Sequence, residues 1–267
     1  MAEPRHWLTA IRLMLGLVLL VGGAVGIDWL LRVENYPVKS VRFEGPFRQV
    51  QREQLEAAVM GSVRGNFFLV DLDAIKQRVE SIPWVHRASV RRSFPDEIAI
   101  AYSEQKLVAR WGARDWVNAS GEVVRVPAAE LPADAPTLSG PDGTSEQVLH
   151  AYRSFATAVG GNALHVRALM LTPRRVWRVE LAPTSETAAA PAFVVMLDRD
   201  QPERRLERFA RLYGRTLSAA VADVRAVDLR YTNGFSVEWR SPQAAARALA
   251  APPPVRVTAS LAGENEG

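Results

Sequence analysis

An apolar run near the N-terminus constrains this chain more than any other feature. Residues 13–31 contain a single charged side chain, Asp28, which falls in the last turn of the run. At a rise of about 1.5 Å per residue, a helix over these positions spans about 28 Å, close to the hydrocarbon thickness of a bilayer. Trp7 and Trp29 lie near its two ends, as interfacial aromatic residues do. The run therefore predicts one transmembrane helix, at 13–31, after a short N-terminal tail at 1–12.

A cleaved signal peptide is the alternative interpretation of this run. Ala24, Val25 and Gly26 offer small residues for a cleavage site, but apolar residues continue past them to Leu31. That continuation favours an uncleaved anchor. Charge alone does not orient the helix, because basic residues both precede and follow it.

Composition excludes several classes of protein. The chain has no cysteine, so a disulfide scaffold, a cysteine-based zinc or iron–sulfur site and thiol catalysis are ruled out. Its hydrophobic fraction of 48% is that of a folded chain. A net charge of +4 spread over 267 residues is too dilute for a nucleic-acid-binding patch.

Residues 38–105 have the patterning of a compact α+β domain. Apolar residues alternate at 41–43, recur at helical spacing within 50–60 and 72–82, and alternate again within 86–94 and 98–102. Gly61 and Pro83 end the two helices, and Asp71 precedes the second one as an N-cap. The predicted order is strand, helix, helix, strand, strand.

Residues 106–240 predict a second, β-rich domain. Short strands are expected within 106–127, 163–171, 175–181, 193–197, 224–231 and 235–239. One helix is expected behind a capping box of Thr144 and Gln147, and another behind Asp200 and Pro202. Asn233-Gly234 predicts a hairpin between the last two strands. The Ala- and Pro-rich residues 241–267 are expected to form a disordered tail.

Motifs for catalysis are missing from the sequence. The four histidines are widely spaced, with no H-E-x-x-H, and no G-x-S-x-G is present. Ser103-x-x-Lys106 matches S-x-x-K only superficially, because it ends a strand and its companion motifs do not follow. An anchored hydrolase is therefore disfavoured. We expect no enzyme activity, no metal, no cofactor and no small-molecule substrate.

The last hairpin is the best candidate for a binding site. A terminal hairpin strand often lies at a sheet edge, where unpaired N–H and C=O groups can accept a partner strand. The hairpin carries Arg230, Tyr231, Phe235 and Trp239, residue types that dominate interface energetics. The same aromatic residues could instead belong to the core, and patterning does not decide between these readings. A basic stripe at Arg204, Arg208, Arg211 and Arg215 is interpreted as a solvated helix face, because glutamates interleave with it.

Three stretches in order resemble the FtsQ/DivIB family of bacterial cell-division proteins: FFLVDLDAI at 67–75, IPWVHRASVRRSFPDEI at 82–98 and ARWG at 109–112. The resemblance covers nearly the whole chain. It implies a single-pass protein of the bacterial inner membrane that localises to the division septum. A cytoplasmic tail (1–12) and a transmembrane helix (13–31) are followed by a periplasmic POTRA domain (38–105). A mixed, β-rich domain whose sheet has an open edge (106–240) completes the implied α+β fold.

The resemblance also implies partners and site residues. The last long strand of the β domain binds the small division protein FtsB, which acts with FtsL, and the POTRA domain meets upstream division proteins. Onto this chain the family's segment maps as Arg230, Tyr231, Asn233, Gly234 and Trp239, with Phe235 beside them. A second basic position maps to Arg175, with Arg174 and Trp177 as weaker candidates, and Val90 is a weak candidate on the POTRA domain. The implied function is an essential divisome scaffold in which Arg230 and Arg175 pair with acidic partner residues.

A POTRA-type chaperone of outer-membrane protein assembly or secretion is the alternative function. Chains of that class place POTRA units before a transmembrane β-barrel. Here one such unit follows an N-terminal helix, and no long series of alternating ten-residue strands appears. The sequence therefore favours the division protein.

Overall fold

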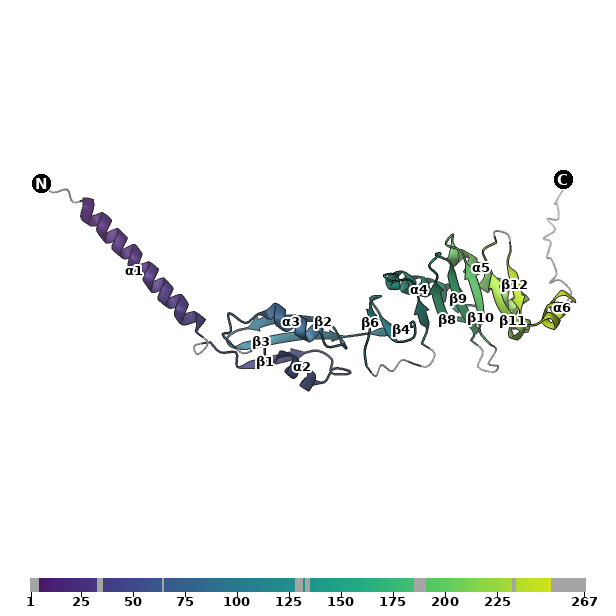
Figure 1. The fold of residues 1–267 in the computed structure, drawn as a ribbon, viewed down its shortest axis with the longest axis horizontal. Helices are drawn as coiled ribbons and strands as arrows, with labels where there is room; N and C mark the ends of the chain where they lie inside the picture. The colour runs from purple at the N-terminus through teal and green to yellow at the C-terminus, as the bar shows by residue number, and fades with distance from the viewer. Residues whose placement is uncertain are drawn as a thin grey trace, which may run out of the picture. The chain divides into compact units, whose positions relative to one another are not determined.

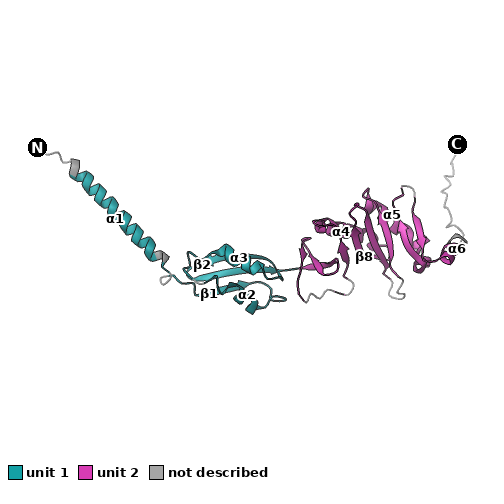
Figure 2. Ribbon diagram, in the orientation of Figure 1, with its two compact units in different colours: residues 1–105 teal, residues 106–267 magenta. Residues whose placement is uncertain are grey.

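A computed structural model describes residues 5–32, 36–63, 65–127, 132, 135–184, 191–231 and 234–250 of the chain. The chain divides into two compact units, residues 1–105 and residues 106–267 (Figure 2).

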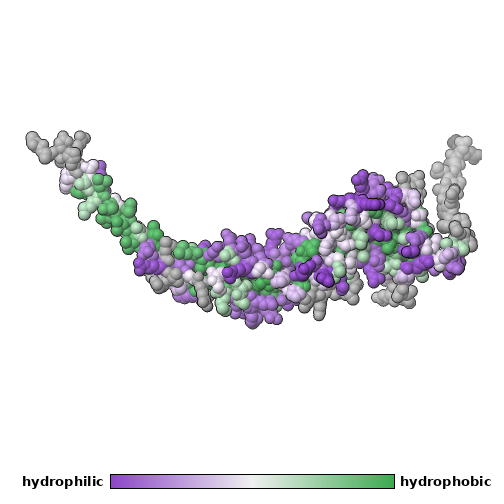
Figure 3. Space-filling model, in the orientation of Figure 1, coloured by the Kyte–Doolittle hydropathy of each residue, from purple (hydrophilic) through white to green (hydrophobic). Residues whose placement is uncertain are grey.

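The first unit begins with a long apolar helix. Helix α1 spans Arg5–Leu31, and its stretch Trp7–Trp29 is long and apolar enough to cross a membrane. None of that stretch is buried against the rest of the chain. Figure 3 shows α1 as a mostly green, apolar surface, whereas the visible faces of the two units are largely polar. An apolar helix long enough to span a membrane is therefore present where one was expected, and it begins at Arg5, eight residues before 13.

A three-stranded sheet follows in the order β1-β3-β2. Strand β1 (Ser40–Glu44) runs parallel to β3 (Glu97–Glu104), and β2 (Val85–Ser93) runs antiparallel to it. Helices α2 (Arg52–Val59) and α3 (Leu72–Glu80) lie between β1 and β2 in the chain. The predicted order of strand, helix, helix, strand, strand is confirmed.

The core of this small domain comes from the apolar faces that the spacing predicted. Ile98 and Ile100 alternate along β3 and are fully buried with Leu55 of α2 and Ile75 of α3. Asp71 caps α3 as predicted, because its Oδ1 accepts a hydrogen bond of 3.0 Å from the N–H of Ala74.

The second unit contains a nine-stranded mixed sheet in the order β12-β11-β10-β9-β8-β7-β4-β5-β6. From β8 onward the strands lie side by side in chain order (Figure 1). Pairs β10–β11, β7–β8 and β4–β7 are parallel, and the others are antiparallel. The strands are β4 Leu107–Trp111, β5 Asp115–Asn118, β6 Val123–Val124, β7 Thr137–Ser139, β8 Leu164–Leu171, β9 Trp177–Pro183, β10 Phe193–Leu197, β11 Val224–Asp228 and β12 Ser236–Trp239.

Helices α4 (Ser145–Gly160) and α5 (Pro202–Thr216) share one core with this sheet. Phe155 of α4 and Phe209 of α5 are almost completely buried, as are Val179 and Val195 of the sheet. A short 3₁₀ helix, η1 (Ser218–Asp223), connects α5 to β11. The expected α+β class, with a POTRA-like domain and an open-edged mixed sheet, is confirmed.

Three local predictions are wrong. The segment 241–267 begins with a helix, α6 (Pro242–Ala250), in which Ala244 is buried, while residues 251–267 lie outside the described part of the chain. Strand β11 ends at Asp228 rather than at 231. The Thr144 hydroxyl donates to the carbonyl oxygen of Pro141 at 2.6 Å instead of capping α4, so no capping box forms with Gln147.

Gly45 allows a close approach of two segments of the first unit. A Cβ added there would lie 2.7 Å from both the carbonyl oxygen and the ring of Tyr102. The Gly45→Ala variant is therefore expected to lose about 1–3 kcal/mol of unfolding free energy, the usual cost of overpacking. Urea unfolding followed by far-UV circular dichroism measures this. Gly61→Ala is the matched control, because its Cβ would meet only the flexible end of Arg78 at 3.6 Å. Equal stability of the two variants would contradict the prediction.

Candidate partner-binding surface

Strand β12 forms one edge of the nine-stranded sheet. It pairs only with β11, and no other described strand lies on its outer side. The N–H of Arg240, just after the strand, donates to the carbonyl oxygen of Asp223 at 2.8 Å. Because N–H direction alternates along a strand, the N–H groups of Val237 and Trp239 point to the open edge.

Asp228, the last residue of β11, bonds to the turn that follows it at residues 229–231. This carboxylate accepts a hydrogen bond from the backbone N–H of Arg230 at 3.0 Å. It also accepts from the guanidinium of Arg230, with Nη2 to Oδ2 at 2.6 Å and Nε to Oδ1 at 2.9 Å. Asp228 is buried, whereas the Arg230 side chain is about half exposed, at 47%. The turn explains why β11 stops before 231, and it gives Arg230 an internal partner.

This ion pair changes the acid–base behaviour of Asp228. The hydrogen bond from the Arg230 side chain lowers the pKa of Asp228 below its usual value and outweighs burial, which acts in the opposite direction. Asp228 therefore stays charged at neutral pH and holds the Arg230 guanidinium in place. An acidic partner residue that pairs with Arg230 must therefore share its guanidinium with Asp228, which already binds one side of it.

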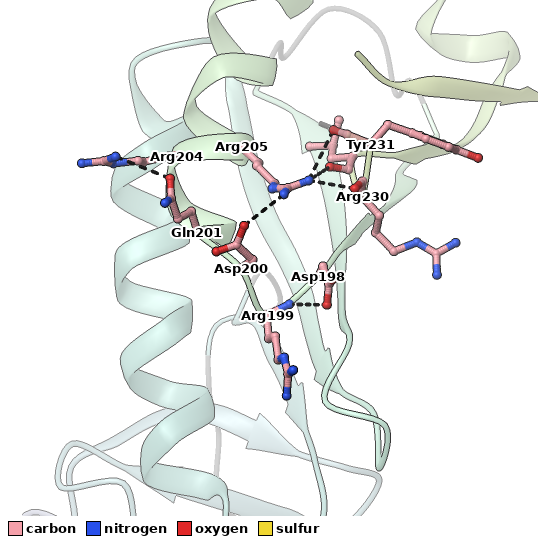
Figure 4. Close-up of polar contacts among 9 residues, drawn as sticks. Asp198, Arg199, Asp200, Gln201, Arg204, Arg205, Arg230 and Tyr231 are labelled. Carbon is pink, nitrogen blue, oxygen red and sulfur yellow. Dashed lines mark hydrogen bonds and ion pairs between the residues drawn. The ribbon is translucent and has the colours of Figure 1, made fainter. Parts of the chain in front are cut away.

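Arg205 of α5 holds the backbone that follows. Its Nη1 donates to the carbonyl oxygens of Leu229 (3.1 Å), Arg230 (2.8 Å) and Tyr231 (3.3 Å). Its Nη2 contacts Asp200 Oδ2 at 3.3 Å, and the side chain is only 19% exposed. Figure 4 shows Arg205 between Asp200 and this backbone, with the Arg230 side chain pointing away from it. Asp200, which was expected to cap α5, therefore pairs with Arg205, and Gln201 precedes the helix.

Arg205 is a functional candidate that the sequence did not identify. Arg204 and Arg208 were assigned to a solvated basic stripe on α5. Arg205 lies between that stripe and the buried face of the helix. The signal that could have identified Arg205 is its position beside the apolar face of the helix. It comes just before Leu206 and four positions before Phe209, both of which are buried.

A pocket of about 390 Å³ opens beside this turn. Its lining combines apolar and basic side chains from α5 with residues of the turn: Arg205, Arg208, Phe209, Leu212, Leu229, Tyr231, Gly234 and Phe235. Tyr231 is 60% exposed at its rim. The structure thus brings Tyr231, Gly234 and Phe235 together at this pocket, and Arg230 precedes Tyr231 in the chain.

The aromatic residues of the hairpin divide between surface and core. Tyr231 is exposed, so it is no core residue. Phe235 and Trp239 are partly buried against the main core, and the Phe235 ring meets Phe209 edge-on at 5.6 Å. Each of these two side chains therefore packs against the core and remains partly exposed. Asn233 lies outside the described residues.

The second basic position lies at the same end of the sheet. Arg175 occupies the turn before β9 with a left-handed backbone (φ 61°), and its Nη1 donates to Gln147 Oε1 at 3.1 Å. Leu197, the last residue of β10, pairs with Trp177. Asp228 pairs with Met196, so the turn at 175 and the turn at 230 flank the end of β10. Arg174 and Arg175 are exposed.

Trp177 is a correction to the candidate list. Its side chain is buried in the main core, and its ring meets Phe155 edge-on at 5.7 Å. Because its indole is buried, Trp177 is not available to a partner on the surface. Its packing instead anchors the start of β9.

Val90 lies on β2, which is an edge strand of the three-stranded sheet. The N–H of Ala88 donates to Glu80 Oε1 of α3 at 2.9 Å, so it points away from β3. The N–H of Val90, two positions on, points the same way. Val90 is partly buried and lines a groove between α3 and β2.

Comparison with known proteins identifies relatives for both units. Residues 36–105 match the family model described as POTRA domain, FtsQ-type, and residues 109–230 match the model described as cell division protein FtsQ/DivIB, C-terminal. The chain is 30% identical over 228 residues to the cell division protein FtsQ of Coxiella burnetii, covering 85% of this chain and 90% of that protein. It is 31% identical over 221 residues to the FtsQ of Burkholderia pseudomallei, covering 83% and 87%. The match to the FtsQ of Xanthomonas campestris is 32% over 235 residues, covering 88% and 79%.

The ion pair at Asp228 predicts a pH dependence of stability. Because the folded pKa of Asp228 is lowered, its contribution is present above about pH 4, the usual aspartate pKa, and is lost as pH falls further. Asp228→Asn should reduce the unfolding free energy at pH 7 by on the order of 1–2 kcal/mol, a charge-assisted hydrogen bond discounted for the exposure of Arg230. Urea unfolding at successive pH values should show this difference shrinking below pH 4. Arg230→Met should remove the same component, and a difference that stays constant with pH would exclude this pair as its source.

Proposed function

Because the chain belongs to the FtsQ/DivIB family of cell-division proteins, we propose that it is a non-enzymatic scaffold that binds FtsB, together with FtsL, through strand β12. In this proposal it links division proteins that act before and after it. The family membership supports a protein partner in cell division, and the geometry of the sheet edge supports the mode of binding.

The open edge of β12 is the observation that carries the proposal. The outward N–H groups of Val237 and Trp239 can bind a partner strand, and main-chain hydrogen bonds of this kind supply affinity in strand addition. The adjacent turn is held by Arg205, so little conformational entropy remains to be lost there on binding.

The side chains around the edge define the chemistry of the partner. An apolar partner residue fits the pocket beside Phe235, and Tyr231 can cover it. An acidic partner residue is attracted to the exposed part of Arg230. Arg175 lies beyond one intervening strand, about 10 Å away at the usual strand spacing. A partner that reaches both arginines must therefore extend across the end of the sheet as well as along its edge.

The membrane helix supports a location at the cell's inner membrane. The apolar helix makes the chain a single-pass membrane protein, and we propose that its N-terminus is cytoplasmic and that the domains at 38–105 and 106–240 are periplasmic. Localisation to the division septum belongs to the same proposal.

The edge of the first unit supports a second contact. Strand β2 is open on the side of Val90, and the groove between α3 and β2 lies beside it. We propose that an upstream division protein adds a strand there. Glu80 blocks the N–H of Ala88, so the incoming strand would pair from Val90 onward.

Removing one outward N–H tests binding at β12. Val237→Pro eliminates a donor on the open side while leaving the β11 side intact, so FtsB should bind about tenfold more weakly or worse while the protein stays folded. Titration of purified FtsB against the full chain measures this. Tyr231→Ala should also weaken binding without loss of stability, because this side chain is exposed.

Glu238→Pro is the matched control for this experiment. It removes an N–H that points to β11 and should destabilise the hairpin instead. If the folded Val237→Pro and Tyr231→Ala variants bind FtsB with unchanged affinity, β12 is not the docking edge.

Val90→Pro tests the contact on the first unit. It removes the outward N–H of β2, so the full chain carrying a fluorescent tag should lose septal localisation while its affinity for FtsB is unchanged. Val90→Thr has nearly the same shape and retains the N–H, so it should localise normally. Normal septal localisation of Val90→Pro would argue against recruitment through β2.

A further inference from the structure

Three segments of the first unit meet at the end of the domain where the chain enters from α1. Strand β1 starts beside the start of β3, because Ser40 pairs with Glu97. The β2–β3 turn, residues 94–96, is therefore at this end, and the N–H of Lys39 donates to the carbonyl oxygen of Asp96 at 2.9 Å. The loop 65–70 joins them, because the N–H of Phe67 donates to the carbonyl oxygen of Tyr36 at 2.8 Å.

This end carries large apolar side chains that the domain does not cover. Phe94 is 78% exposed, Leu69 is 61% exposed and Phe68 is 39% exposed. The Phe68 ring meets Tyr36 edge-on at 5.4 Å, which fixes its position. We call Phe68, Leu69 and Phe94 the apolar rim.

Chain connectivity keeps the apolar rim near the end of the membrane helix. Tyr36 is only five positions after Leu31, the last residue of α1, and five residues reach at most about 18 Å when extended. The side chain of Asn66 also donates to the carbonyl oxygen of Arg32 at 2.9 Å. Trp29, an interfacial type of residue, lies in the last turn of the helix.

Most backbone polar groups of the loop that carries Phe68 and Leu69 are hydrogen-bonded within the domain. The Arg92 guanidinium donates to the carbonyl oxygens of Phe67 (2.8 Å), Phe68 (3.1 Å) and Val70 (2.7 Å). The N–H groups of Phe68, Leu69 and Val70 all donate to Asn66, at 2.8, 2.9 and 3.0 Å. Unpaired backbone groups are what normally keeps a loop out of an apolar medium, and these hydrogen bonds reduce that cost.

We propose that the apolar rim inserts into the interfacial layer of the bilayer that α1 crosses. The domain then rests on the membrane by Phe94 and Leu69 as well as being tethered through residues 33–35. This inference depends only on the membrane helix, so it stands apart from the proposed binding of FtsB.

In this proposal, burial of apolar side chains drives the rim into the membrane, and attraction between charges does not. Two basic side chains at this end have acidic partners: Lys39 Nζ lies 2.7 Å from Asp96, and Arg32 Nη2 lies 2.6 Å from Asp28. A third, Arg92, is bound by the carbonyl groups of the loop. Contact with the membrane should therefore not require anionic lipid. A bilayer is favoured over a protein partner because the helix necessarily places lipid within reach of the rim.

The absence of cysteine makes a direct test simple, since single cysteines can be introduced without background labelling. Spin labels are attached to Leu69→Cys and Phe94→Cys in the full chain, which is reconstituted in vesicles of phosphatidylethanolamine and phosphatidylglycerol or of phosphatidylcholine alone. Collision with oxygen, which partitions into lipid, is compared with collision with a water-soluble nickel chelate. Phe47→Cys is the matched control, because Phe47 is an exposed phenylalanine at the opposite end of the domain, where its ring contacts Tyr102.

The ratio of oxygen to nickel collisions at 69 and 94 should be several-fold higher than at 47 in both kinds of vesicle. Equal ratios at the three positions would show that the rim stays in water and would overturn the proposal. Low collision rates with both reagents at 69 and 94 would show a protein covering instead and would also overturn it. The double variant Leu69→Ser, Phe94→Ser should bind FtsB normally, which separates this inference from the function of β12.

Discussion

The shape of the candidate surface depends on the hydrogen bonds that the Arg205 guanidinium donates. Three successive carbonyl groups after β11 accept hydrogen bonds from this one partly buried arginine. The helix that carries Arg205 also packs into the main core through Phe209. Stability of the core and geometry of the surface are therefore coupled through a single helix, α5. A lysine would preserve the charge but not the planar fork that spans several oxygens.

The neighbouring ion pair gives the surface its electrostatic character. Burial alone would disfavour a charged Asp228, and the hydrogen bonds from Arg230 reverse that tendency. In return, Asp228 holds one side of the guanidinium and leaves the rest half exposed. A partner carboxylate thus meets an arginine whose position is already set, which lowers the entropy lost on binding but also requires sharing with Asp228. Removal of Arg230 alone would leave the buried carboxylate of Asp228 without this partner, whereas removal of Asp228 would leave a guanidinium that water still reaches.

Most of the architecture was predictable from patterning, and most of the surface was not. Helical and strand periodicity located Leu55, Ile75, Ile98 and Ile100 in one core, because those signals are local. Burial of Trp177 was not visible, since an aromatic residue after two arginines fits an interface equally well. The hydrogen bonds from Arg205 to the segment after β11 join residues more than twenty positions apart. The sequence carries no local signature of such contacts, so the hairpin was expected to be longer and simpler than it is.

The sheet of the second unit grows in chain order from β8 to β12, and this has a consequence for incomplete chains. Whichever strand has been made last is the edge at that moment. A chain shortened before β11 would end its sheet at β10, whose sequence FVVML is wholly apolar. Unprotected edges of that composition promote aggregation. Loss of the C-terminal residues would therefore do more than delete the proposed docking strand: it would expose a template for self-association.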